Sequence, residues 1–286
     1  MLRSIYDIKT VTAELDHAEG LNFGPDGNCY AGGEDGQLYR ISPGGEVSSY
    51  GQTRGGIGGV CLDASGNLYA CSYGTASVEK VSPDGSVTSH SAGTTDIPAV
   101  DPNYPVFDAE GFLYYSDSGD YYRPSGRLFA VRPDGATMHI FGSHLQYPNG
   151  LAIDPSDSWL YVVQSTAHNL IRFPLLGEGR VGEPETYVRL PGVVPDGIAF
   201  AENGSIYVAC YSPDIILRVL PDRRVETVVQ DLGSDVLNRP TNVAFQPGTT
   251  NLWFVNFGGH SMRYVDVDEH GAPLHFPPDE PNEEPR

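Results

Sequence analysis

Six residues recur at intervals of 39 to 47 positions, and together they could bind a hard metal ion. Each immediately precedes an apolar run, and the six are Glu19, Gly58, Asn103, Asn149, Asp196 and Thr241. The set offers two carboxylates, two carboxamides and one hydroxyl, without a positive charge. Ca²⁺ binds about six to eight such oxygen ligands, and it would relieve repulsion between Glu19 and Asp196. We therefore expect a Ca²⁺ site with positions left open for water or substrate.

The donor types also limit which other metals are expected at this site. Neither His nor Cys occurs in the set, which argues against copper and weakens the case for Zn²⁺. Mg²⁺ and Mn²⁺ accept oxygen ligands, so Mg²⁺, Mn²⁺ and Zn²⁺ stay as alternatives to Ca²⁺. Each residue alone would be an ordinary turn residue before a strand, and only their joint alignment favours a metal.

The elements that position these residues follow from the same repeat. In each unit an apolar run, a turn such as Pro-Asp-Gly and an apolar-aromatic run follow one another, as in GLNFGPDGNCYAGG from Gly20 and GIAFAENGSIYVAC from Gly197. A third run follows in every unit and a fourth in all but the last. Antiparallel strands joined by tight turns have this signature, and a period of about 40 to 50 residues indicates a propeller. The sequence therefore predicts an all-β, six-bladed β-propeller of four-stranded blades; an open β array or a sandwich is the alternative.

The ends of the chain complete this prediction. The sixth repeat lacks a fourth strand, and residues 4–15 (SIYDIKTVTAEL) supply a spare one, which we expect to pair with the last blade and close the ring. Residues 1–275 are thus predicted to form one domain. Residues 276–286 (FPPDEPNEEPR) form an acidic, Pro-rich tail that is expected to be disordered or to act as a loose strap.

Charge and composition exclude several classes of partner. Lys and Arg number 17 against 37 Asp and Glu, a net charge of −20 that would repel nucleic acid and anionic membranes. A small-molecule partner is expected instead. No signal-peptide or membrane-spanning stretch is found, so a cytoplasmic protein is expected. The cysteines Cys29, Cys61, Cys71 and Cys210 lie in strand-like runs and are predicted to be buried free thiols, with disulfides as the alternative.

Loops between the second and third strands of each blade should surround the opening above the six residues. The longest, SDSGDYYRPSG, contains Tyr121, Tyr122 and Arg123, which could form a lid over a ligand. We expect Tyr122, Arg123, Tyr211 and His260 from these loops, together with Asp101 and Asn103, to bind substrate. For any single residue, a solvated loop is the alternative.

Several motifs resemble one known family over residues 15–265. AEGLNF around Glu19, PNY at Asn103, YPNGLAID around Asn149, VPDGIAF around Asp196 and RPTNVAF near Thr241 are similar to the senescence-marker-protein, gluconolactonase and luciferin-regenerating-enzyme-like family. The resemblance implies a six-bladed propeller with a divalent cation, often calcium, in the central channel, and in many members hydrolysis of lactones. It also implies that Glu19, Asn149 and Asp196 are metal ligands, that Asn103 is a further ligand or substrate contact, and that Asp196 is the general base or acid.

The chain departs from this family at two points. Sugar lactonases of the family have an Arg two residues before the Asn and an Asp after it, where this sequence has Asp101 and Tyr104. An anionic or polyhydroxylated sugar would lose a partner there. No His pair is evident of the kind that paraoxonases, distant propeller relatives, place above their calcium.

These features together predict a calcium-dependent lactonase or related esterase. The alternatives are phosphotriester hydrolysis or an isomerase or lyase step at the same site, and a non-catalytic binding scaffold in which the cation only ties the blades together. A purely structural ring could use the same residue in every blade. The unequal set observed leaves an open coordination sphere and favours an enzyme.

Overall fold

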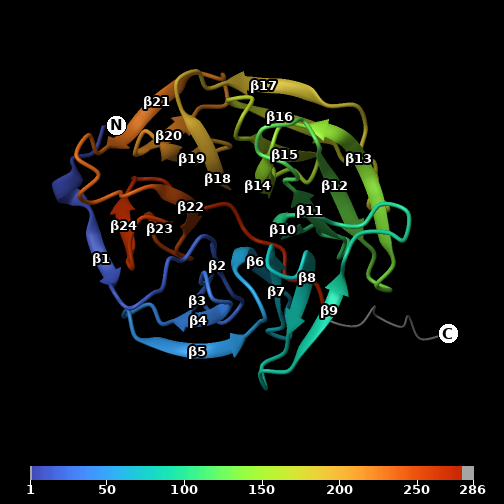
Figure 1. Cartoon of the computed structure of the whole chain (residues 1–286). Helices are drawn as coiled ribbons and strands as arrows, with labels where there is room; N and C mark the ends of the chain where they lie inside the picture. Colours follow the sequence, from blue (N-terminus) through green and yellow to red (C-terminus); the bar gives the residue numbers. More distant parts are fainter. Residues whose placement is uncertain (1, 279–286) are drawn as a thin grey trace.

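Residues 2–278, which the computed structural model describes, form an almost entirely β structure with one short 3₁₀ helix, η1 (Ile5–Asp7). Six four-stranded antiparallel sheets are arranged around a central axis (Figure 1). The predicted six-bladed β-propeller is thus confirmed.

The first three blades each consist of four consecutive strands. Blade one contains β2 (Leu21–Phe23), β3 (Cys29–Gly32), β4 (Gln37–Ile41) and β5 (Val47–Gln52). Blade two contains β6 (Ile57–Leu62), β7 (Leu68–Ser72), β8 (Ser77–Val81) and β9 (Val87–Ser91). Blade three contains β10 (Pro102–Phe107), β11 (Leu113–Asp117), β12 (Gly126–Val131) and β13 (Thr137–Leu145).

Blades four and five repeat this order, and blade six differs in the origin of one strand. Blade four contains β14 (Pro148–Ile153), β15 (Trp159–Gln164), β16 (Asn169–Pro174) and β17 (Glu185–Arg189). Blade five contains β18 (Val194–Phe200), β19 (Ile206–Ser212), β20 (Ile215–Val219) and β21 (Val225–Gln230). Blade six contains β22 (Pro240–Phe245), β23 (Asn251–Asn256), β24 (Met262–Asp266) and the N-terminal β1 (Lys9–Thr12).

The N-terminal strand closes the ring as predicted. β1 pairs antiparallel with β24, with Lys9 opposite Tyr264 and Thr12 opposite Met262. The strand itself is shorter than the predicted segment 4–15, because Ile5–Asp7 form η1. Pairing the two ends of the chain covers the edge that β24 would otherwise expose.

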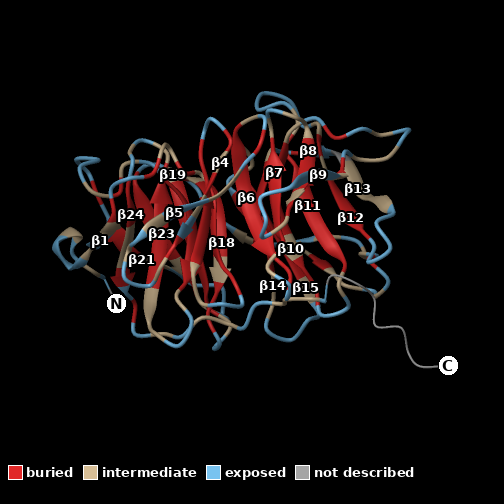
Figure 2. Ribbon diagram, turned by 90° about the horizontal axis from the view of Figure 1, so that it is seen from below, coloured by how far each residue is buried: buried red, intermediate tan, exposed pale blue. Residues whose placement is uncertain are grey.

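Adjacent blades pack through aromatic side chains in equivalent places. At four of the six junctions an aromatic residue from the second strand of one blade contacts, edge to face, a Phe at the end of the first strand of the next. The pairs are Tyr69–Phe107, Tyr161–Phe200, Tyr207–Phe245 and Trp253–Phe23, with ring centroids 5.0 to 5.2 Å apart. Such contacts each add about 0.5–1.5 kcal/mol to the burial of apolar area. Buried residues fill inner strands such as β6 and β7, while outer strands such as β5 and β9 and most loops are more exposed (Figure 2).

The turn between the first and second strands of blade three shows how the repeat forms locally. Gly111 adopts a φ of 85°, which favours glycine. One carboxylate oxygen of Asp108 accepts hydrogen bonds from the main-chain N–H groups of Glu110 and Phe112, both at 2.9 Å. The other accepts a hydrogen bond from the Tyr114 hydroxyl at 3.0 Å. The carboxylate of Asp108 is buried but fully satisfied, and it fixes the turn.

The C-terminal residues 271–278 cross the end of the channel at which the first strands finish (Figure 1). The N–H of Ala272 donates to the carbonyl of Phe200 in blade five at 2.9 Å. The N–H of Ala64 in blade two donates to the carbonyl of Pro277, also at 2.9 Å. Residues 276–278 thus belong to a segment that is hydrogen-bonded to blades two and five. Residues 279–286 of the predicted tail lie outside the described residues.

Two further expectations concern membranes and cysteines. Among the described residues no helix has the length and apolar character that crossing a membrane would require. All four cysteines are buried free thiols, as predicted. Burial raises the pKa of each thiol, so these cysteines are protonated at neutral pH.

Candidate active site

A cavity of about 500 Å³ opens at the end of the channel where the first strands begin. Its floor is formed by residues of the predicted ring, namely Glu19, Asn103, Asn149, Asp196 and Thr241. Each blade contributes one residue to its wall near the junction of its second and third strands: Tyr211 lies near the end of β19, and the others lie in the connecting loops, namely Glu34, Tyr73, Tyr121, Ser165 and Phe257. The repeat therefore places a floor of oxygen donors beneath a largely aromatic wall.

Irregular strand pairing coincides with the floor positions. In β10, β14 and β18 the register shifts across Asn103, Asn149 and Asp196 respectively, and in β22 it shifts at Thr241. A proline precedes each of these residues and cannot donate a ladder hydrogen bond. A bulge changes the direction of a side chain, which explains how a strand residue comes to line the channel. The sequence placed these residues just before the first strands, whereas they lie within the strands.

The glycines of the Pro-Asn-Gly and Pro-Asp-Gly motifs bring neighbouring blades close together. A Cβ at Gly150 would lie 2.7 Å from the carbonyl oxygen of Asp196, and one at Gly197 would lie 2.2 Å from Oδ1 of Asn242. Such contacts are too short for any side chain. Glycine at both positions allows the first strands to approach, so that Asn149 and Asp196 become neighbours.

Buried hydroxyl groups link the floor of one blade to that of the next. Ser116 donates to the carbonyl of Asn149 at 2.7 Å, and Thr241 donates to the carbonyl of Glu19 at 2.7 Å. Ser165 does the same for the carbonyl of the residue before Asp196, at 2.7 Å. These bonds fix the main chain on which the oxygen donors are carried, and they leave the side chains of Asn149 and Asp196 free to face the cavity.

Asp101 is held at the edge of the floor by a buried carboxylate. Asp117 accepts hydrogen bonds from the N–H groups of Val100, at 3.2 Å, and Asp101, at 2.6 Å, and it pairs with Arg127 at 3.3 Å. Burial and the charge of Asp117 raise the pKa of Asp101 to about 6, against a hydrogen bond from Tyr147 that lowers it. Asp101 is therefore a carboxyl group able to gain or lose a proton near neutral pH.

The floor carboxylates are destabilised as anions when no cation is bound. Burial, followed by the charge of Asp101, raises the pKa of Glu19 to about 7. Burial and the charge of Glu19 raise the pKa of Asp196 well above its usual range, although a hydrogen bond from Asn149 opposes this shift. Two buried acidic groups that repel each other destabilise the folded state. Such pairs are concentrated at functional sites, so this pair indicates one.

Two buried oxygen atoms on the floor have no hydrogen-bond partner. They are Oδ1 of Asn149 and Oδ1 of Asp196, from adjacent blades. An unsatisfied buried acceptor costs about 1–3 kcal/mol, so a native structure rarely leaves two together. Both are hard oxygen donors, and with Glu19 they fit a divalent cation such as Ca²⁺.

The other predicted substrate-binding residues separate into two groups. Asp101, Asn103 and Tyr211 line the cavity. Tyr122, which is 91% exposed, does not, nor do the exposed Arg123 and His260. Tyr121 from the same loop does line the cavity, and the lid over a ligand stays a prediction.

Tyr147 is a cavity residue that the sequence reasoning missed. It directly precedes the Pro-Asn-Gly motif, and its ring packs against that of Tyr121, with centroids 4.9 Å apart. It has a φ of 54°, a conformation unusual for tyrosine. An aromatic residue directly before this motif could have indicated a cavity residue. Tyr147 lies outside both the ring positions and the loops between second and third strands, so the repeat alone does not predict it.

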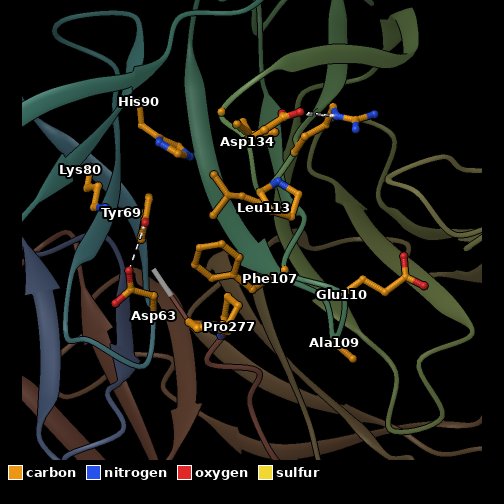
Figure 3. Close-up of a pocket in the computed structure, with 16 residues that line it drawn as sticks. Asp63, Tyr69, Lys80, His90, Phe107, Ala109, Glu110, Leu113, Asp134 and Pro277 are labelled. Carbon is orange, nitrogen blue, oxygen red and sulfur yellow. Dashed lines mark hydrogen bonds and ion pairs between the residues drawn. The ribbon is translucent and has the colours of Figure 1, made fainter. Parts of the chain in front are cut away.

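A second cavity, of about 520 Å³, lies between blades two and three at the opposite end of the strands (Figure 3). Phe107, Leu113 and Pro277 lie around it. The carboxylate of Asp63 at its edge is satisfied by the side chains of Asn67, at 2.7 Å, and Tyr69, at 3.1 Å. It has no floor of convergent, unsatisfied donors among the described residues, so the candidate site is the cavity over the channel.

Residues 88–256 match the model of the SMP-30/gluconolactonase/LRE-like region. The chain belongs to this family. The lactonase drp35 of Staphylococcus aureus strain USA300 is 28% identical over 173 residues, which cover 56% of this chain and 53% of that protein. The match thus spans about half the length of this curated relative.

Solved structures of family members share the fold. The gluconolactonase XC5397 of Xanthomonas campestris superposes with a TM-score of 0.78 at 17% identity, covering 91% of this chain and 89% of that one. Regucalcin of Agrobacterium tumefaciens, described as a calcium-binding protein, superposes with a TM-score of 0.77 at 17% identity, covering 93% and 94%. At these identities the superpositions establish the propeller fold alone.

Proposed function

We propose that this family member is a metal-dependent lactonase, with Ca²⁺ held by Glu19, Asn149 and Asp196. The observation that carries the proposal is the pair of partnerless buried oxygens on Asn149 and Asp196 at the floor of an open cavity. The family match and the lactonase relatives support the reaction class. A bound Ca²⁺ would supply a Lewis acid that polarises the lactone carbonyl and stabilises the oxyanion.

In the proposed reaction, Asp196 moves the proton. Its carboxylate takes a proton from water as the water oxygen bonds to the carbonyl carbon, and returns it to the ring oxygen as the carbon–oxygen bond of the lactone breaks. The product is the open hydroxy acid. A carboxylate bound to a cation is a weak base, so Asp196 would take this proton as the water or the substrate shifts its coordination to Ca²⁺. Asn103 lies on the same floor and would contact the substrate or serve as a further ligand.

The cavity wall favours a neutral, partly apolar lactone. Glu19, Glu34, Asp101 and Asp196 all line the cavity, and none of the described residues that line it is Lys, Arg or His. An anionic lactone would be repelled. Tyr73, Tyr121, Tyr147, Tyr211 and Phe257 offer flat apolar surfaces to a ring or an aliphatic substituent. Gluconolactone itself is neutral but lacks apolar groups, so we expect aliphatic or aromatic lactones to be better substrates.

The test is a pH-indicator assay of lactone hydrolysis on chelator-stripped protein, with and without added Ca²⁺. The panel holds neutral aliphatic, neutral aromatic, sugar and anionic lactones. We expect turnover of neutral lactones that depends on Ca²⁺ and falls by about 10²- to 10⁴-fold in Asp196→Asn. Asp35→Asn removes an exposed carboxylate that does not line the cavity and is the matched control.

Two outcomes would overturn parts of the proposal. If no lactone is hydrolysed while Ca²⁺ still binds, the same cavity would have to serve phosphotriester hydrolysis, an isomerase or lyase step, or binding alone. If Asp196→Asn keeps full activity, the proton-transfer role assigned to Asp196 is wrong.

A further inference from the structure

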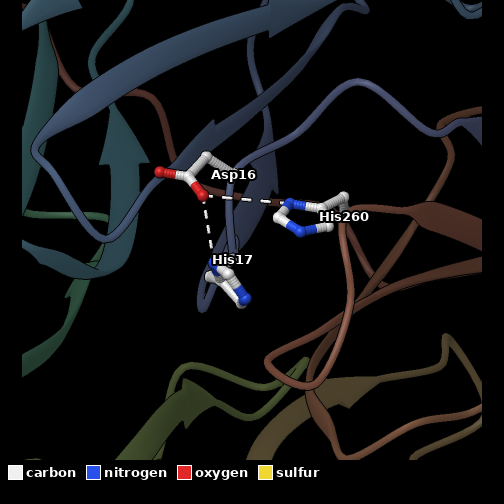
Figure 4. A group of neighbouring side chains, drawn as sticks. All are labelled: Asp16, His17 and His260. Atoms are coloured by element: carbon white, nitrogen blue, oxygen red, sulfur yellow. Dashed lines mark hydrogen bonds and ion pairs between the residues drawn. The ribbon is translucent and has the colours of Figure 1, made fainter.

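We infer that the rim of the cavity carries a second metal site, built for a transition metal of the Zn²⁺ type from Asp16, His17, His260 and Glu34. One donor atom from each of Asp16, His17 and His260 lies within 4.8 Å of the others. Nδ1 of His17 is 3.0 Å from Oδ1 of Asp16 and 3.5 Å from Oε2 of Glu34. The two imidazole rings have centroids 4.4 Å apart, and both lie beside the Asp16 carboxylate (Figure 4).

No sequence motif indicates this group, because its members are not related by the repeat. Asp16 and His17 lie between β1 and β2, Glu34 lies between β3 and β4, and His260 lies between β23 and β24. The closure of the ring brings them together. The N–H of Leu15 donates to the carbonyl of His260 at 3.0 Å, which fixes the two segments side by side.

The spacing of the donors fits a tetrahedral ion. Ligands at about 2.0–2.2 Å from Zn²⁺ lie roughly 3.4 Å from one another. Nδ1 of His17 lies 3.0 Å from Oδ1 of Asp16 and 3.5 Å from Oε2 of Glu34. Small side-chain rotations are sufficient to surround an ion, since His260 and Glu34 have side chains 59% and 53% exposed.

Surrounding groups already orient the ligands. The second oxygen of Asp16 accepts a hydrogen bond from the Gln37 amide at 3.0 Å. Nδ1 of His260 lies 3.0 Å from the carbonyl of Leu15, which favours a proton on Nδ1 and leaves Nε2 as the metal ligand. Carboxylates and histidines in metal sites are commonly held by such outer contacts.

The donor types separate this site from the floor of the cavity. Two imidazoles with two carboxylates suit Zn²⁺ and Co²⁺, whereas the all-oxygen floor suits Ca²⁺. An ion at the rim would join the N-terminal segment to the last blade, across the seam where the ring closes. It should therefore stabilise the fold, whatever reaction the cavity performs.

The experiment uses Co²⁺ and Zn²⁺ on the full chain, stripped with chelator and then saturated with Ca²⁺ to fill the floor. We expect Co²⁺ to give the visible absorption of a tetrahedral nitrogen–oxygen site, Zn²⁺ to displace it with one equivalent, and Zn²⁺ to raise the melting temperature. His17→Gln and His260→Gln should each weaken Co²⁺ binding by about tenfold or more. His270→Gln, a histidine that lies outside the group and contacts the carbonyl of Thr249, and Asp196→Asn should bind Co²⁺ as the unaltered chain does.

The proposal fails if His17→Gln and His260→Gln bind Co²⁺ as tightly as the unaltered chain. It also fails if Asp196→Asn abolishes the signal, which would place the ion on the floor. A third contrary result is a melting temperature that does not respond to Zn²⁺. None of these results depends on lactone hydrolysis.

Discussion

The two ends of the central channel differ in the hydrogen bonding of their buried carboxylates. At the end crossed by residues 271–278, Asp108 is surrounded by two main-chain N–H groups and the Tyr114 hydroxyl. At the cavity end, Asp196 has an oxygen without a partner and faces Glu19, a second acid. Asp108 follows the first strand of blade three, and Asp196 lies within the first strand of blade five. The satisfied carboxylate indicates a structural role at one end of the channel, and the unsatisfied one indicates a ligand site at the other.

The same contrast appears in the main chain and in what covers each end. The first strands pair irregularly at the cavity end, where their side chains line the floor. At the other end Phe107, Ile153 and Phe200 pair regularly, and the segment from Ala272 to His275 covers them. Substrate access is therefore expected from one side only.

Replacing Asp108 should give the largest change in stability. Asp108→Ala removes three hydrogen bonds and leaves the Tyr114 hydroxyl and two N–H groups without partners, so we expect a loss of about 3 kcal/mol in the free energy of unfolding. Urea unfolding measures it. Ca²⁺ affinity, followed by calorimetry, should be unchanged. A reduced Ca²⁺ affinity would contradict the separation of the two ends.

The floor should make the cation-free protein less stable as pH rises. The pKa of Glu19 is about 7 in the folded chain against 4.5 when unfolded, so between these values the folded state holds the extra proton. The contribution of Glu19 to stability then falls from about pH 5 to about pH 7, by on the order of 2 kcal/mol, and levels off above.

Urea unfolding in chelator at several pH values tests this slope. Glu19→Gln should reduce it, and the residual slope should come from Asp101, whose pKa is raised to about 6, and from Asp196, whose pKa is also raised. Saturating Ca²⁺ should abolish it in the unaltered chain. Stability that instead increases with pH in chelator would refute the electrostatic description of the floor.

Asp196→Asn should have the smallest effect on stability, with a sign opposite to that of Asp108→Ala. Removing a buried charge that faces Glu19 should stabilise the cation-free protein by about 1 kcal/mol. Thermal unfolding in chelator measures this gain, and added Ca²⁺ should no longer raise the melting temperature. Destabilisation similar to that of Asp108→Ala would mean that Asp196 is a structural residue.

Much of this structure could be predicted because the repeat encodes it locally. Each blade carries its own turn residues and alternating strands, so six units of similar length predict six blades, and a missing fourth strand predicts closure by residues 4–15. The floor follows from the same register, since equivalent positions in a closed ring share one height. For that reason Glu19, Asn103, Asn149 and Asp196 could be predicted to meet, and they line one cavity.

The positions of residues that do not follow the repeat were decided only by the tertiary structure. The direction of a loop depends on its neighbours, so Tyr121 and Tyr147 line the cavity while Tyr122 is exposed. His17 and His260 are adjacent only because β1 pairs with β24, a contact between opposite ends of the chain. Local patterns determined the blades and their common floor. Long-range packing, which the sequence repeat does not show, determined the cavity wall, the cavity rim and the covered end of the channel.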